Sequence, residues 1–101
     1  MVEVRQTEEF SGWLHGLKDA NAIARIVARI RRMELGNPGD AKSVGKGVME
    51  MRIAYGPGYR VYFGKDGPAI VILLGGSTKQ RPGEAIAGAI DCWLDYRRRK
   101  R

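Results

Sequence analysis

The chain has 101 residues, the size of one domain, and its 44% hydrophobic and 29% charged residues argue against a disordered chain. Its formal net charge is +7, which favours phosphate-rich partners or an acidic protein. Residues 97–101 supply five of the seven net charges, so the remainder of the chain is nearly balanced.

Cysteine content and apolar runs indicate the compartment. Cys92 is the only cysteine, which excludes an internal disulfide and a cysteine zinc cluster and favours a reducing cytoplasm. The first residues lack the pattern of a signal peptide. No apolar run approaches the roughly 18 residues that cross a membrane. The sequence therefore predicts a cytoplasmic protein without membrane contact.

The first third predicts a strand and two helices. Val2 and Val4 alternate with charged residues, as in a short half-buried strand. Thr7 and Asp19 are suitable N-caps for two helices, and Gly36 ends the second. The expected core positions of these helices are Phe10, Trp13, Leu14 and Leu17, followed by Ile23, Ile26, Val27, Ile30 and Met33.

The middle of the chain predicts a loop and a hairpin. Residues 36–47 are rich in Gly, Asn, Asp and Ser and are expected to form a functional loop that carries Lys42 and Lys46 as candidate RNA phosphate contacts. Residues 47–55 and 59–63 alternate like strands around a turn at residues 56–58. With Pro57 at the tip, Arg52 pairs with Tyr62 and lies diagonal to Arg60.

The last third predicts an interior strand and a helix. Residues 69–74 are apolar on both faces, which is typical of an interior strand, and Gly75 and Gly76 are expected to end it. A helix follows Pro82. The predicted order is β-α-α-β-β-β-α, an α+β fold with a mostly antiparallel four-stranded sheet packed with helices. Residues 1–97 form the predicted domain and residues 98–101 a basic tail.

The polar face of the predicted hairpin carries the most informative cluster, formed by Glu50, Arg52, Arg60 and Tyr62. Two neighbouring guanidinium groups repel each other unless an anion lies between them, and a phosphodiester matches the arginine fork. Alternatively, Glu50 neutralises one arginine in a surface ion pair worth about 0–1 kcal/mol. The residues alone leave both interpretations open.

Other polar groups are weaker signals. Residues 77–81 place hydroxyls and cations, including Thr78, Lys79 and Arg81, after a strand, which suits phosphate contacts without the P-loop spacing. His15 is the only histidine, and the acidic residues lack metal-ligand spacing, so neither a metal nor another cofactor is expected. Helix residues 25, 29 and 32 are arginines at helical spacing, which suits either RNA contact or a solvated face.

Residues 50–63, EMRIAYGPGYRVYF, resemble the signature of the RelE/ParE toxin superfamily, closest to the addiction module killer or HigB-like branch. The resemblance continues through residues 72–76, 78–81 and 93–97. It implies a RelE-like fold and a type II toxin that inhibits translation by cutting mRNA at the ribosome. By this resemblance Arg52 and Arg60 hold the phosphate and Lys79 adds charge on the leaving side. Arginine is a poor base, so Glu50 is the expected base, with Tyr62 or Tyr96 as proton donors or stacking partners.

The resemblance also implies partners. A cognate helix-turn-helix antitoxin is expected, and operator DNA is contacted only through that antitoxin. Two alternatives stay open: a ParE-like inhibitor of DNA gyrase on the same fold, or a nucleic-acid-binding module without catalysis. Cutting RNA requires the set of Arg52, Arg60 and Lys79, whereas gyrase binding does not.

Overall fold

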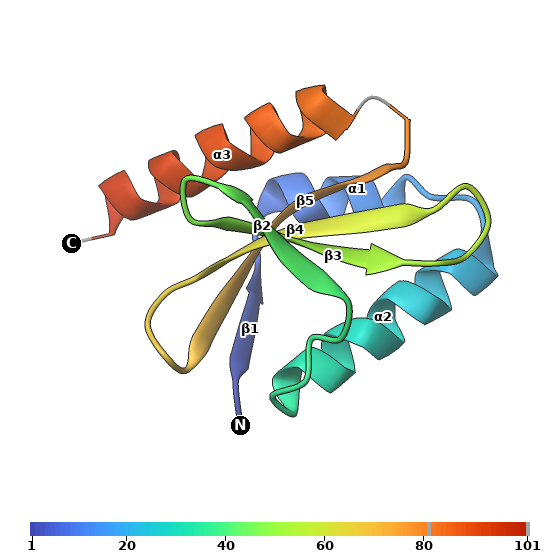
Figure 1. The fold of residues 1–101 in the computed structure, drawn as a ribbon, viewed down its shortest axis with the longest axis horizontal. Helices are drawn as coiled ribbons and strands as arrows, with labels where there is room; N and C mark the ends of the chain where they lie inside the picture. The colour runs from blue at the N-terminus through green and yellow to red at the C-terminus, as the bar shows by residue number, and fades with distance from the viewer. Residues whose placement is uncertain (81, 101) are drawn as a thin grey trace.

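The computed structural model describes residues 1–80 and 82–100 and has an α+β fold in which helices cover both faces of one sheet (Figure 1). The elements in chain order are β1 (Glu3–Gln6), α1 (Glu8–His15), α2 (Ala20–Glu34), β2 (Ala41–Gly45), β3 (Val48–Ile53), β4 (Tyr59–Lys65), β5 (Ile70–Thr78) and α3 (Pro82–Arg99). None of the helices in these described residues is long and apolar enough to span a bilayer.

The sheet is mixed and has five strands in the order β1-β5-β4-β3-β2. β1 pairs with β5 in parallel, and the other three pairs are antiparallel. The expected four-stranded sheet is therefore wrong in its strand count, because β2 forms inside the 36–47 stretch predicted as a loop. β2 is a short edge strand with only Ala41 and Val44 as apolar residues, a composition common at sheet edges.

The predicted helix starts are confirmed. Thr7 Oγ1 accepts a hydrogen bond from the Phe10 N–H at 3.2 Å, and Asp19 Oδ1 accepts one from the Asn21 N–H at 2.9 Å. The buried positions of α2 are Ala22, Ile26, Ile30 and Met33. Val27 was expected in the core but is 44% exposed, because it lies beside the buried stripe rather than on it.

The β3–β4 hairpin forms, but its predicted register is wrong by two residues. Arg52 lies directly opposite Arg60, and Glu50 lies opposite Tyr62. The connection is longer than expected, since Gly58 N–H donates to the Tyr55 carbonyl at 3.0 Å within residues 54–58. A shift of two residues leaves every side chain on its predicted face, because side chains in a strand alternate with a period of two.

Two hydrophobic cores lie on opposite faces of the sheet. One packs α1 and α2 against residues including Val61 and Phe63. The other packs α3 against Val48, Tyr62 and Leu74. The hairpin face expected to be polar and open is therefore partly covered by α3, and Tyr62 is 0% exposed.

Glycines allow two tryptophans to lie close to the sheet. A Cβ on Gly64 would lie 2.6 Å from the Trp93 ring, and one on Gly76 would lie 2.3 Å from the Trp13 ring. Gly76 thus forms part of β5, which runs on to Thr78 instead of ending at the glycine pair. The domain boundary expected at residue 97 falls inside α3, which continues to Arg99.

Candidate functional site

The antiparallel pairing of β3 and β4 places Arg52 and Arg60 side by side on the face of the sheet that α3 partly covers. Directly opposite residues in an antiparallel pair have Cβ atoms about 5 Å apart, and like charges in that position destabilise the sheet. Each arginine has a carboxylate partner of its own, and the two partners come from different segments.

Arg60 is held by a buried carboxylate. Its Nη1 donates to Glu50 Oε2 at 3.1 Å, and the exposed fractions of the two side chains are 19% and 1%. Glu50 Oε1 is buried without a hydrogen-bond partner in the described residues. A buried carboxylate needs its cationic partner, because an uncompensated charge in the interior is strongly destabilising. Glu50 therefore fixes the position of the Arg60 guanidinium.

Arg52 has an exposed partner. Its Nη2 donates to Asp40 Oδ1 at 2.9 Å, and these side chains are 42% and 59% exposed. The hydrogen bond from Arg52 holds the pKa of Asp40 below its ordinary value, and the same contact raises the pKa of Arg52. Exposed ion pairs are weak and exchange readily, so an incoming anion can replace Asp40 on Arg52.

Arg29 of α2 braces the segment that presents Asp40. Its guanidinium donates to the Arg52 carbonyl at 2.6 Å and to the Pro38 carbonyl at 2.9 Å. A Cβ on Gly39 would lie 2.7 Å from Arg29 Nη2, so glycine is needed for this approach. Burial lowers the pKa of Arg29, and the neighbouring charge of Arg32 lowers it further. One helix arginine thus fixes both ends of the Arg52–Asp40 pair.

Lys79 and Ser77 extend the cluster along β5. Ser77 is the partner of Arg60 in the ladder, and its Oγ lies 3.0 Å from the Tyr62 hydroxyl. Lys79 is exposed and continues beyond Ser77, and its side chain passes close to Gly58 of the hairpin loop. Lys42 is exposed on β2 opposite Glu50, so it also belongs to this face.

Three expected site residues do not belong to this cluster. Thr78 lies opposite the buried Tyr59, so it belongs to the other face of the sheet from Arg60. Lys46 occupies the β2–β3 turn, at the far end of β3 from Arg52.

Tyr96 lies near the C-terminal end of α3, where its hydroxyl donates to Asp66 at 2.7 Å and its ring stacks on Trp93. The hydrogen bond to Asp66 raises the pKa of Tyr96.

The structure corrects the expected surroundings of Tyr62. Tyr62 was expected on an open face as a stacking partner for bases, but its ring lies in the α3 core, and burial raises the pKa of its hydroxyl. The predicted phosphate contact at Arg81 falls outside the described residues.

The sequence gives no prediction of a site role for Asp40, whereas Ser77 falls in the segment 77–81 predicted to suit phosphate contacts and Arg29 is one of the helix arginines that suit either RNA contact or a solvated face. The only sequence signal at Asp40 is its place in the Gly-rich segment 36–47, whose composition predicts a loop. Arg29 is half-buried and donates to two backbone carbonyls, which neither of those two interpretations predicts.

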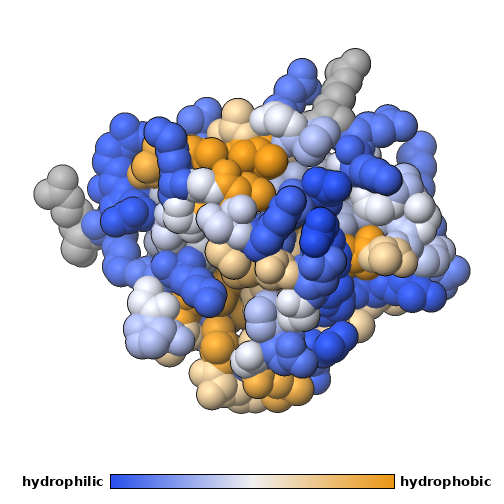
Figure 2. All heavy atoms as spheres, in the orientation of Figure 1, coloured by the Kyte–Doolittle hydropathy of each residue, from blue (hydrophilic) through white to orange (hydrophobic). Residues whose placement is uncertain are grey.

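The arrangement suits recognition of a phosphodiester. It offers one fixed guanidinium, Arg60, one releasable guanidinium, Arg52, and the exposed ammonium of Lys79 at the same end of the sheet. Figure 2 shows hydrophilic side chains over the middle of the visible face, where β2 and β3 lie in Figure 1. Within residues 1–80 and 82–100, no three His, Cys, Asp or Glu side chains gather as metal ligands.

Comparison with known proteins gives one informative relationship. The chain is 43% identical over 88 residues to a protein of Haemophilus influenzae that is described as uncharacterized. The match spans 87% of this chain and 89% of the relative, so it includes nearly the whole of both. No protein-family model matches the chain. Identity of this extent means that the chain belongs to the same protein family as the Haemophilus influenzae protein.

Proposed function

We propose that this protein is the toxin of a type II toxin–antitoxin pair and that it cuts messenger RNA at the ribosome. The observation that carries the proposal is the direct opposition of Arg52 and Arg60 on an accessible part of the sheet. Two guanidinium groups at opposed positions favour an anion between them, and arginine forks match phosphate oxygens. The resemblance of residues 50–63 to the RelE/ParE signature supports the same assignment.

The reaction proposed is cleavage of the RNA backbone by the neighbouring ribose. The 2′-hydroxyl loses its proton and its oxygen forms a bond to phosphorus. The bond from phosphorus to the 5′-oxygen then breaks, and that oxygen takes up a proton from water. The products are a 2′,3′-cyclic phosphate and a 5′-hydroxyl. Arg52 and Arg60 stabilise the charge that develops on the phosphoryl oxygens, and Lys79 stabilises the departing 5′-oxygen.

The two carboxylates have different roles in this proposal. Glu50 is the base implied by the family resemblance, but its 1% exposure and its bond to Arg60 favour a positioning role. Asp40 is the accessible carboxylate beside Arg52, and we assign the proton-accepting role to it. A carboxylate is a weak base for a ribose hydroxyl, so much of the rate comes from the ribosome holding the RNA in line.

The proposed regulatory partner is an antitoxin with a helix-turn-helix domain, which alone contacts the operator DNA. The net charge of +7 favours an acidic contact surface on that partner. The expected outcome of co-expression is loss of toxicity together with a stable complex that survives gel filtration.

Mapping of RNA 5′ ends in a translating extract tests the proposal. Added protein is expected to create new ends with 5′-hydroxyls, and Arg52→Gln is expected to reduce them by about 100-fold. Arg32→Gln is the matched control, since it removes the same charge from an exposed arginine of α2. Unchanged RNA ends with the wild-type protein, or inhibition of gyrase without new ends, would refute the assignment.

A further inference from the structure

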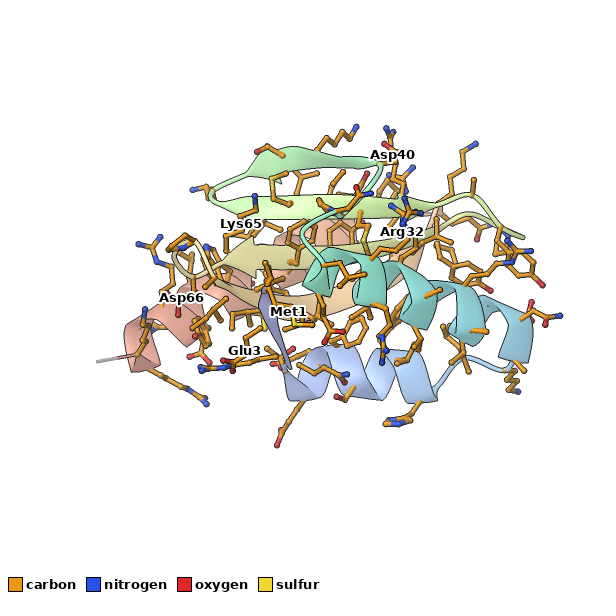
Figure 3. The ribbon with its side chains drawn as sticks, turned by 90° about the horizontal axis from the view of Figure 1, so that it is seen from below. Met1, Glu3, Arg32, Asp40, Lys65 and Asp66 are labelled. Atoms are coloured by element: carbon orange, nitrogen blue, oxygen red, sulfur yellow. The ribbon has the colours of Figure 1, made fainter. Side chains whose placement is uncertain are left out.

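A second group of cations surrounds a hollow at the opposite end of β4 from Arg60. The hollow has a volume of about 580 Å³ and lies between Gly47, residues 65–67 and the last turns of α3. Its charged residues are Lys65, Asp66, Arg97 and Lys100, so three cations and one carboxylate leave a charge of +2. Figure 3 shows Lys65 and Asp66 toward the end of the sheet where α3 finishes, away from Asp40.

The carboxylate of Asp66 already has hydrogen-bond partners within this hollow. Its side chain accepts hydrogen bonds from Tyr96, at 2.7 Å, and from Lys100. Lys65 and Arg97 are exposed, and neither forms an ion pair within residues 1–80 and 82–100. These two side chains therefore supply the charge that is available to a ligand.

Trp93 adds an unsatisfied donor at the wall of the hollow. The residue is 4% exposed, and its indole N–H has no acceptor among the described residues. A Cβ on Gly47 would lie 2.8 Å from that nitrogen, so glycine is needed for the β2–β3 turn to pack this closely against the indole. Arg97 lies over the same ring, 5.8 Å from its centroid. A buried donor without an acceptor and two available cations on one hollow together favour an anionic ligand.

We propose that this hollow binds the phosphate backbone of single-stranded RNA at a second point, several nucleotides from the phosphate held by Arg52 and Arg60. Arg60 and Lys65 are five residues apart on β4, about 17 Å along the strand. Their side chains start from opposite faces of the sheet, and Lys65 lines the hollow because it lies at the end of the strand. About five stacked nucleotides span that length at roughly 3.4 Å each. The exposed Lys42 of β2 lies on the same face as Glu50 and Arg60, between the two points. This inference rests on the proposed function, because it gives the RNA a path across the molecule.

The test measures binding of a 2′-O-methyl RNA of about ten nucleotides, which cannot be cut and which exceeds the five-nucleotide span. The double variant Lys65→Gln/Arg97→Gln is expected to bind this RNA about tenfold more weakly and to reduce the slope of log affinity against log salt by about 1.4. A trinucleotide is too short to reach the hollow, so its affinity is expected to be unchanged. In a Trp13→Phe background, Trp93 is the only indole, and its emission is expected to change when the longer RNA binds.

The control is Lys18→Gln/Arg31→Gln, which removes two exposed charges elsewhere on the molecule. Equal weakening by control and test variants, or wild-type binding by the test variant, overturns the inference. The inference is also overturned if the test variant binds poly-glutamate more weakly than the wild type does but binds RNA equally well. The hollow would then be a site for an acidic protein. A wild-type protein that fails to cut mRNA but shows the expected length-dependent binding refutes the proposed function and retains this second site.

Discussion

Arg52 and Arg60 occupy directly opposed positions on β3 and β4, yet each gives its guanidinium to a different carboxylate. The two carboxylates differ in burial: Glu50 is 1% exposed and Asp40 is 59% exposed. One guanidinium is therefore fixed by the interior, and the other is free to exchange its partner with an incoming phosphate. This asymmetry sets the expected effects of substitutions in the cluster.

The first prediction concerns stability. Arg60→Ala is expected to lower the free energy of unfolding by about 3 kcal/mol, because Glu50 is left buried without its cation. Arg52→Ala is expected to lower it by less than about 1 kcal/mol, since its pair with Asp40 is exposed. Urea denaturation followed by circular dichroism measures both values. Adding Glu50→Gln to Arg60→Ala should recover part of the lost free energy of unfolding. Equal losses of this free energy for the two arginine variants would contradict the difference in burial.

A second prediction separates binding from cleavage at Asp40. Asp40→Asn removes a charge that competes with phosphate for Arg52, so affinity for a non-cleavable RNA is expected to rise about threefold at low salt. The same change removes the proposed proton acceptor, so the cleavage rate is expected to fall about 100-fold. Anisotropy and single-turnover cleavage measure the two effects. A parallel fall in affinity and rate would mean that Asp40 only supports the structure.

The third prediction concerns the brace from Arg29. Arg29→Lys replaces the two nitrogens that donate separately to the Arg52 and Pro38 carbonyls with a single ammonium nitrogen, so the segment carrying Asp40 should be held less firmly. The cleavage rate is expected to fall at least about tenfold. The free energy of unfolding is expected to fall by only about 1–2 kcal/mol.

A double-mutant cycle checks that Arg29 acts through Asp40. In the Asp40→Asn background, Arg29→Lys should have almost no further effect on the rate. Arg32→Lys, on the exposed side of the same helix, is the control. An additive loss in the double variant would show that Arg29 acts by another route.

A fourth prediction links pH to the attachment of α3. Hydrogen bonds from Lys100 and then Tyr96 hold the pKa of Asp66 below its ordinary value. An aspartate with a lowered pKa stabilises the folded state above its unfolded pKa of about 3.9 and loses that effect as the pH falls through the folded value. Asp66→Asn should therefore be less stable than the wild type at pH 7, and the difference should shrink as the pH falls below the unfolded pKa and through the lower folded pKa of Asp66. Thermal unfolding across pH measures it, with Asp91→Asn as an exposed control.

Hydrophobic periodicity and helix-capping residues were sufficient to predict much of the fold. Thr7 and Asp19 are N-caps as predicted, and the hairpin strands have their predicted faces. The hairpin register could not be fixed in this way, because shifts by two residues preserve the pattern of faces. β2 was missed because its sequence, AKSVG, has too few apolar residues to differ from a loop.

The site was predictable only in part, for reasons of long-range packing. The spacing of Arg52 and Arg60 on paired strands is a local property, so the sequence placed both on one face. Burial of Glu50 and Tyr62 depends on α3, about 30 residues later, and no local pattern reports that contact. The Asp40 and Arg29 contacts likewise depend on how residues 36–40 return to the end of β3.

The most direct test of the central claim is a crystal structure of the protein with a short 2′-O-methyl RNA. The account predicts a backbone phosphate between the guanidiniums of Arg52 and Arg60. It also predicts that Asp40 has left Arg52 while Glu50 still holds Arg60. RNA bound elsewhere, with both ion pairs intact, would contradict the claim that Arg52 and Arg60 bind the scissile phosphate.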